Sequence, residues 1–271
     1  MGAFNVQNHP FDIIFGSKPI LISMPHNGIL VPDDILLKMT DSAKLLVDTD
    51  WYLDKLYQFA VDQGCYLIKP KYNRYVIDLN RSKHDENLYP GQDTTELCPT
   101  TQFSKRKIYL DGYEPKQKEI EQRVEQYWQP YHEQIALTLA QIKDKFGIAL
   151  LFEAHSIKSE VPRFFEGQLP DFNFGTYNGK SCSELLEQSF SGWEPEGYSA
   201  VTNGRFKGGY ITRAYGNPRK NIHSLQLELS QATYMNEDKL EFDQGKANRV
   251  TLALQEMFEK FEQFINNEKQ H

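Results

Sequence analysis

Two histidines each follow an apolar run of the kind that forms a buried strand. The run Pro19-Ile-Leu-Ile-Ser-Met-Pro leads to His26, and Ile148-Ala-Leu-Leu-Phe-Glu-Ala leads to His155. In α/β proteins, the carboxyl ends of strands carry the groups that bind and react. Two imidazoles in that setting suggest a metal site built from separate strands. The other five histidines are expected to be structural: His9, His84, His132, His223 and His271.

A hydrolytic zinc site needs three nitrogen or oxygen ligands from the protein and an open position for water. Asp48 and Asp50 lie in a stretch, residues 41–63, whose apolar spacing predicts a helix. Either carboxylate could join His26 and His155 on the metal, and the other could cap the helix. Histidine with carboxylate suits zinc, while cobalt, nickel, iron and manganese tolerate the same ligands.

Glu228 is the candidate general base. It lies in Leu225-Gln-Leu-Glu-Leu229, whose alternation predicts a strand with Gln226, Glu228 and Ser230 on one face. A carboxylate aimed from a strand into a cleft can take a proton from a metal-activated water. The alternative is a solvated face with no role in chemistry.

Three arginines are candidates for binding a carboxylate. Arg81 follows an expected strand at residues 75–78, and Asn80 beside it adds a donor. Arginine can grip a carboxylate with two parallel hydrogen bonds. Arg74 and Arg213 are weaker candidates on the same reasoning. The alternative for each is a surface ion pair.

Composition narrows the class of protein. The net charge of −7 over 271 residues argues against nucleic acid as the main partner. No apolar run approaches the roughly 18–20 residues of a membrane span, and the N-terminus does not have the layout of a signal peptide. We therefore expect a cytoplasmic protein. The three cysteines are odd in number and widely spaced, although Cys182 could be a nucleophile at a helix start.

The pattern of elements predicts an α/β fold, as one domain over residues 1–271, with a mixed, largely parallel sheet flanked by helices. Two segments, 85–113 and 162–180, look irregular and are expected to shape the substrate pocket. Expected strands cover 19–24, 65–68, 75–78, 148–154, 210–213 and 225–229. Expected helices cover 41–63, 114–145 with Pro130 as a candidate interruption, a segment after Ser181, and 237–264.

Taken together, these segments resemble the N-formylglutamate amidohydrolases, also called deformylases, of histidine degradation. The resemblance runs nearly end to end. It is carried by Ser23-Met-Pro-His-Asn-Gly28, Asp48-Thr-Asp-Trp-Tyr52, Arg74-Tyr-Val-Ile-Asp-Leu-Asn-Arg81, Glu153-Ala-His-Ser156, Pro162-Arg-Phe-Phe-Glu-Gly167, Gly208-Gly-Tyr-Ile-Thr-Arg213 and Leu225-Gln-Leu-Glu228.

That family is similar in turn to zinc carboxypeptidases and aspartoacylase-type deacylases, which implies their fold and ligand types. The resemblance maps His26 and His155 onto the histidine ligands, Glu228 onto the base, and Asn80 with Arg81 onto a carboxylate clamp. Those relatives carry a glutamate three residues after the first histidine, where this chain has Ile29. We therefore choose Asp50 as the acidic ligand, with Asp48 second.

The resulting hypothesis is metal-dependent hydrolysis of the formamide bond of N-formyl-L-glutamate, the last step of a histidine degradation route. The partner is then a small dicarboxylate, and the protein a monomer or small homo-oligomer. Three alternatives remain: the same site acting on another N-acyl amino acid or a short peptide, a cysteine hydrolase using Cys182, and a non-catalytic dicarboxylate-binding protein.

Overall fold

A computed structural model describes residues 9–87 and 91–268 of the chain. Its centre is a seven-stranded sheet in the order β1-β3-β2-β4-β7-β5-β6. The four central strands run parallel, while β1 pairs antiparallel with β3 and β5 antiparallel with β7. The predicted α/β fold with a mixed, largely parallel sheet is confirmed. The strands are β1 Phe11–Ile14, β2 Ile20–Ser23, β3 Tyr66–Pro70, β4 Ala149–Ile157, β5 Phe172–Gly175, β6 Ala200–Thr202 and β7 Ile222–Ser230.

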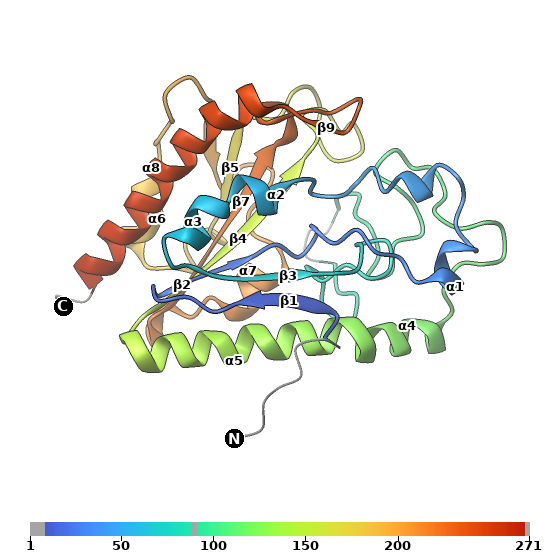
Figure 1. The fold of residues 1–271 in the computed structure, drawn as a ribbon, viewed down its shortest axis with the longest axis horizontal. Coiled ribbons are helices and arrows are strands. Elements are labelled where there is room, and N and C mark those ends of the chain that lie inside the picture. Colours follow the sequence, from blue (N-terminus) through green and yellow to red (C-terminus); the bar gives the residue numbers. More distant parts are fainter. Residues whose placement is uncertain (1–8, 88–90, 269–271) are drawn as a thin grey trace.

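Helices cover both faces of the sheet. Figure 1 shows α8, α6 and α3 over one face and the long α5, which continues from α4, along the other. The helices and helical turns are α1 Asp33–Leu36, η2 Ala43–Leu45, α2 Leu53–Leu56, α3 Gln58–Asp62, α4 Gln117–Arg123, the π-helical η3 Val124–Trp128, α5 Gln129–Phe146, α6 Glu184–Phe190, α7 Tyr210–Tyr215, η4 Pro218–Lys220, η5 Gln231–Thr233 and α8 Gln244–Glu268.

The central strand β4 explains how the sheet presents polar groups. All nine of its residues are buried. Phe152 and its alternate neighbours belong to the hydrophobic core that includes α8, whereas Leu151 belongs to the core that includes α5. Further along this second face come Glu153 and His155, because side chains alternate along a strand. The α5 side of β4 thus changes from apolar to polar toward its carboxyl end.

Two predicted elements in the first third of the chain are wrong. The stretch 41–63 is not one helix, because Leu46 and Tyr52 adopt left-handed backbone angles that interrupt it. The segment 75–78 forms turns rather than a strand, although Tyr75, Val76 and Ile77 are buried as a strand's side chains would be. These three side chains belong to the hydrophobic core on the α5 side of the sheet, so they are buried without pairing as a strand.

The elements predicted for the rest of the chain are partly confirmed. The helix after Ser181 is confirmed as α6, and Pro130 lies in the first turn of α5, where proline is tolerated, so α4, η3 and α5 run on without a break. The segment 162–180 contains β5. The last helix starts at Gln244 because residues 235–242 form a small hairpin of β8 Met235–Asn236 and β9 Glu241–Phe242.

The segment 210–213 is helical and begins α7, where we predicted a strand. Tyr, Ile and Thr favour strands, but the first N–H groups of α7 find acceptors on neighbouring elements. Gly209 N–H donates to Gln226, Ile211 N–H to Asn80, and Thr212 N–H to Glu153. These bonds satisfy the donors that a helix start leaves open.

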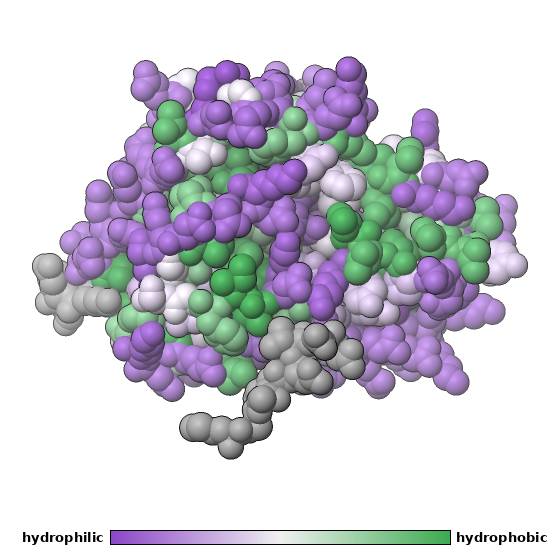
Figure 2. All heavy atoms as spheres, in the orientation of Figure 1, coloured by the Kyte–Doolittle hydropathy of each residue, from purple (hydrophilic) through white to green (hydrophobic). Residues whose placement is uncertain are grey.

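Figure 2 shows hydrophilic side chains over most of one face of the molecule, with smaller hydrophobic areas between them. None of the described helices has both the length and the apolar character that crossing a membrane would require. The extent of the domain, residues 1–271, stays a prediction because both chain ends lie outside the described residues.

Candidate functional site

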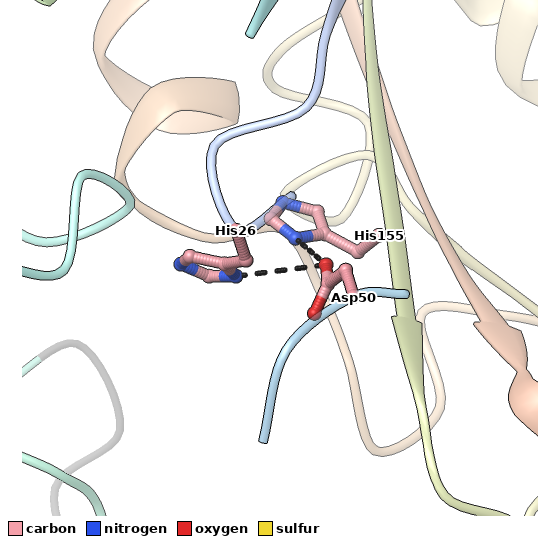
Figure 3. Close-up of side chains that lie close together, drawn as sticks. All are labelled: His26, Asp50 and His155. Carbon is pink, nitrogen blue, oxygen red and sulfur yellow. Dashed lines mark hydrogen bonds and ion pairs between the residues drawn. The ribbon is translucent and has the colours of Figure 1, made fainter. Parts of the chain in front are cut away.

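The structure brings His26, Asp50 and His155 together as a candidate site for a metal ion. One ligand atom from each lies within 4.8 Å of the other two. Oδ2 of Asp50 is 3.2 Å from Nδ1 of His155 and 3.7 Å from Nδ1 of His26 (Figure 3). The three side chains come from β4, the turn after β2 and the loop before α2, and all are buried.

Backbone contacts fix the relation between the two loops. The Asp50 N–H donates to the His26 carbonyl at 3.1 Å, and the Asn27 amide donates to the Asp50 carbonyl at 3.0 Å. Gly28 is required because a side chain there would collide with the carbonyl of Tyr72. The motif Pro-His-Asn-Gly therefore sets the turn that aims His26 at Asp50.

Asp78 contacts His26, and Arg74 in turn contacts Asp78. Oδ1 of Asp78 lies 2.7 Å from Nε2 of His26, and Oδ2 accepts a hydrogen bond from Arg74 at 2.9 Å. Burial alone would raise the pKa of Asp78, but the neighbouring His26 and Arg74 hold it well below its usual range. The carboxylate is thus charged and positioned to orient His26. Sequence reasoning assigned Asp78 no role, although it directly precedes the Leu-Asn-Arg segment.

Asp48 is held apart from the histidines. Its carboxylate accepts hydrogen bonds from the Tyr75 hydroxyl at 2.6 Å and from the Phe103 N–H at 2.8 Å. Burial raises the pKa of Asp48, although both hydrogen bonds act in the opposite direction. Of the two aspartates considered for the metal, the structure places Asp50 next to the histidines.

The residues present fit a divalent cation. Asp50 Oδ2 accepts the Ser156 N–H at 3.1 Å, while its buried Oδ1 has no hydrogen-bond partner among the described residues. Burial would raise the pKa of Asp50, but hydrogen bonds from His155 and His26 lower it below its ordinary value. Two imidazole nitrogens and a charged carboxylate are a donor set that zinc and similar ions accept.

Glu228 lies beside this cluster on β7, in register with His155 on β4. It is 9% exposed and lines a cavity together with both histidines. Burial raises the pKa of Glu228 to about 8, against the opposing charges of His155 and Arg74. A carboxyl group with a pKa near neutrality can both accept and donate a proton under working conditions.

Arg81 also lines the cavity. One of its terminal nitrogens donates to the Thr95 hydroxyl at 3.2 Å, and its Nε lies 3.9 Å from Asp78. This buried Nε has no hydrogen-bond partner among the described residues. The guanidinium donates to a neutral hydroxyl, so its charge can attract an anionic ligand in the cavity that Arg81 lines.

Asn80 and Arg213 have contacts that the sequence did not predict. The Asn80 amide lies 3.0 Å from Nε2 of His155, and its oxygen accepts the Ile211 N–H. Arg213, on α7, donates from Nε to the Gly208 carbonyl and lies over the Tyr177 ring. Asn80 lines the cavity, whereas Arg213 is absent from its described lining. Their substrate-binding roles stay predictions.

The segments 85–113 and 162–180 both line the cavity, through Thr95, Phe103 and Phe164 among others. Arg163 joins the two segments, donating to Asp93 at 2.9 Å and to the Gln102 carbonyl at 2.8 Å. Sequence reasoning missed Arg205, a further arginine of the cavity wall, because no motif marks it in its loop.

Cys182 is not placed as a nucleophile. It is 2% exposed and belongs to the hydrophobic core on the α8 side of the sheet. Burial raises the pKa of its thiol to about 12, so little thiolate forms near neutral pH. It is also absent from the described lining of the cavity that holds His26.

Comparisons with known proteins point to one family. The family model described as N-formylglutamate amidohydrolase matches residues 18–235. The chain is 47% identical over 224 residues to an N-formylglutamate deformylase of Pseudomonas putida, covering 82% of this chain and 84% of that protein. A Pseudomonas aeruginosa protein of the same name is 46% identical with the same coverage.

A solved structure has the same fold. The N-formylglutamate amidohydrolase of Ralstonia eutropha JMP134 superposes with a TM-score of 0.74 at 23% sequence identity, covering 92% of this chain and 97% of its own. A gene product of Agrobacterium tumefaciens gives a TM-score of 0.72 at 12% identity, covering 94% and 96% of the two chains. From the family model and the sequence relatives, this chain belongs to the N-formylglutamate amidohydrolase family.

Proposed function

We propose that this protein hydrolyses the formamide bond of N-formyl-L-glutamate, giving L-glutamate and formate, with a divalent metal ion held by His26, Asp50 and His155. The observation that carries the proposal is the buried His-Asp-His cluster beside Glu228 in a chain 47% identical to a deformylase. Zinc is our choice for the ion, with cobalt, nickel, iron and manganese as substitutes. When bound, such an ion supplies Lewis acidity that polarises the formyl oxygen and makes water more acidic.

Glu228 moves the protons. It takes one from the attacking water as the water oxygen bonds to the formyl carbon. It then gives that proton to the glutamate nitrogen as the C–N bond breaks, so formic acid and a neutral amine leave. The acid's proton then passes to the amine or to solvent, which gives formate. A pKa near 8 suits both halves of this transfer. Arg74, 3.8 Å from Asp50, is a nearby cation for the oxygen that becomes negative.

Arginines bind the two substrate carboxylates in this proposal. Arg81 is the first candidate because its side chain lines the cavity and its guanidinium donates to the neutral Thr95 hydroxyl. Asn80, Arg74 and Arg213 remain the further candidates. A substrate with two negative charges needs such local cations in a protein whose net charge is −7.

Formate release tests this proposal. The protein should release formate from N-formyl-L-glutamate far faster than acetate from N-acetyl-L-glutamate. Equal rates would favour the alternative of a general deacylase for N-acyl amino acids. Tight binding of both compounds without any hydrolysis, with metal bound, would instead identify a dicarboxylate-binding protein and contradict the proposal.

Three further features belong to the same proposal. A place at the end of histidine degradation follows from the reaction, since it would consume N-formyl-L-glutamate. A cytoplasmic location, and a protein that is a monomer or a small homo-oligomer, are consistent with an enzyme that acts on a small intracellular metabolite. Cell fractionation and light scattering of the purified protein test these two.

A further inference from the structure

Glu153 is a buried carboxylate that the proposed reaction does not use. It lies on β4, two residues before His155, and it is 0% exposed. Its Oε2 accepts two hydrogen bonds from Thr212, one from the N–H at 3.1 Å and one from the hydroxyl at 2.7 Å. Its Oε1 has no hydrogen-bond partner among the described residues. A buried carboxylate oxygen without a partner is costly, which points to a role for it.

The neighbour of that oxygen is His155. Oε1 of Glu153 lies 3.6 Å from Nε2 of His155, on the opposite side of the ring from Asp50. The other histidine of the site has the same arrangement, with Nδ1 toward Asp50 and Nε2 at 2.7 Å from Asp78. Each imidazole thus has a second buried carboxyl group near Nε2, the nitrogen that faces away from Asp50.

For the neutral ring, the hydrogen bonds around His155 indicate which nitrogen carries the proton without a metal. Asn80 is oriented by Ile211, whose N–H donates to the amide oxygen, so the amide nitrogen faces Nε2 of His155 at 3.0 Å. An amide nitrogen only donates, so Nε2 accepts there, and Nδ1 donates to Asp50. This tautomer blocks Nδ1 as a metal ligand.

A cation on Nδ1 requires the other tautomer. Neutral imidazole has one N–H, so the proton must then lie on Nε2, which needs an acceptor. Asn80 offers a donor at that position, whereas Glu153 offers a buried oxygen without a partner. A shift of less than ~1 Å would bring Oε1 within ordinary hydrogen-bond distance of Nε2.

We propose that Glu153 is a positioning residue of the metal centre: when a cation binds Nδ1 of His155, Glu153 accepts the hydrogen bond from Nε2 in place of the contact with Asn80. The inference rests on the proposed metal site. It also implies a role for Asn80, which lines the cavity. Once its amide nitrogen no longer donates to His155, that nitrogen can donate a hydrogen bond to a substrate carboxylate.

The first test measures zinc affinity by competition with a chromophoric chelator. Glu153→Gln puts a donor opposite Nε2, so zinc affinity should fall about 10- to 100-fold. Thr212→Val is the matched control: it removes a hydroxyl bond to Oε2 but keeps the carboxylate, and its zinc affinity should stay close to wild type. Wild-type affinity in Glu153→Gln would overturn the inference.

The melting temperature of the metal-free variants separates positioning from a purely structural role. Positioning predicts that metal-free Glu153→Gln melts at or above the wild-type temperature, since it replaces a buried carboxyl oxygen that has no hydrogen-bond partner among the described residues. If Glu153→Gln and Thr212→Val both melt at a lower temperature than wild type and lose zinc affinity to the same extent, Glu153 would be an anchor of α7 only.

A third measurement needs no variant. In the zinc-loaded wild-type protein, ¹⁵N chemical shifts of the histidine side chains should show His155 protonated at Nε2 and metal-bound at Nδ1. Protonation at Nδ1 would overturn the inference while leaving the metal site intact. A wild-type protein that binds no zinc at all would overturn the metal site itself, and with it this inference.

Discussion

Nε2 of His26 lies 2.7 Å from Oδ1 of Asp78, and the second oxygen of Asp78 is bonded to Arg74. The carboxylate therefore orients the imidazole and neutralises the guanidinium at once. Such partners behind a ligand histidine fix its tautomer and raise its basicity.

Asp78→Asn should therefore weaken zinc binding about 10- to 100-fold. It should also lower the free energy of unfolding by about 3–5 kcal/mol, because the buried Arg74 loses its nearest counter-charge. Chelator competition and urea unfolding measure the two effects. Asp62→Asn, the same change on an exposed residue, is the control. Wild-type zinc affinity in Asp78→Asn would contradict the role given to this carboxylate.

Glu228→Gln should keep the metal and lose turnover. The amide cannot take a proton from water, so kcat should fall about 10²- to 10⁴-fold. Metal content by elemental analysis should match the wild-type protein, since Glu228 is not among the three clustered ligands. The exposed Glu160→Gln serves as a matched control. A near-wild-type kcat in Glu228→Gln would remove Glu228 as the base.

Arg81→Met should raise KM for N-formyl-L-glutamate by about 30-fold, equivalent to about 2 kcal/mol, with a smaller change in kcat. The exposed Arg106→Met should leave KM unchanged. Two analogues locate the carboxylate that Arg81 holds: N-formyl-L-norvaline lacks the side-chain carboxylate, and 4-formamidobutyrate lacks the α-carboxylate. For the analogue that lacks the carboxylate bound by Arg81, KM should be the same in the variant and in wild type. If Arg81→Met raised KM equally for both analogues, a direct contact between Arg81 and one carboxylate would be refuted.

His132 should make stability depend on pH. Burial lowers the pKa of His132 to about 4, below the unfolded value of about 6.5. Between these values the unfolded chain binds a proton that the folded chain does not, so the free energy of unfolding falls as pH falls. The loss is about 1.4 kcal/mol per pH unit for one such group.

Urea unfolding between pH 7.5 and 4.5 tests this. The stability difference between wild type and His132→Gln should shrink as pH falls, because only the wild type loses this contribution. Carboxylates that titrate in the same pH range contribute equally to the stability of both proteins, so their contributions cancel in the difference. The exposed His84→Gln should track the wild-type curve. Parallel curves for wild type and His132→Gln would show that His132 does not titrate as described.

Much of this architecture could be predicted because it follows from local pattern. Apolar runs mark β2 and β4, and a polar residue directly after each run lies at the sheet edge, as His26 and His155 do. The alternation in β7 likewise puts Glu228 on a polar face. The resemblance supplied the family, which the comparisons confirm.

The rest depends on contacts between distant segments. Asp48 and Asp50 look alike in sequence. The folded loop separates them, because Asp48 bonds to Tyr75 and Phe103 whereas Asp50 lies with the two histidines. Glu153 lies within an apolar run, so its role depends on Thr212 and His155 on either side of it. Arg205 reaches the cavity from a loop without regular pattern.

The most direct test of the account is formate release from N-formyl-L-glutamate by protein whose metal has been removed with a chelator, followed by addition of zinc. The account predicts that release stops when elemental analysis finds no metal and returns with about one equivalent of zinc per chain, the one-ion stoichiometry expected for a three-ligand hydrolytic site. Release at an undiminished rate from protein verified to be metal-free would contradict it.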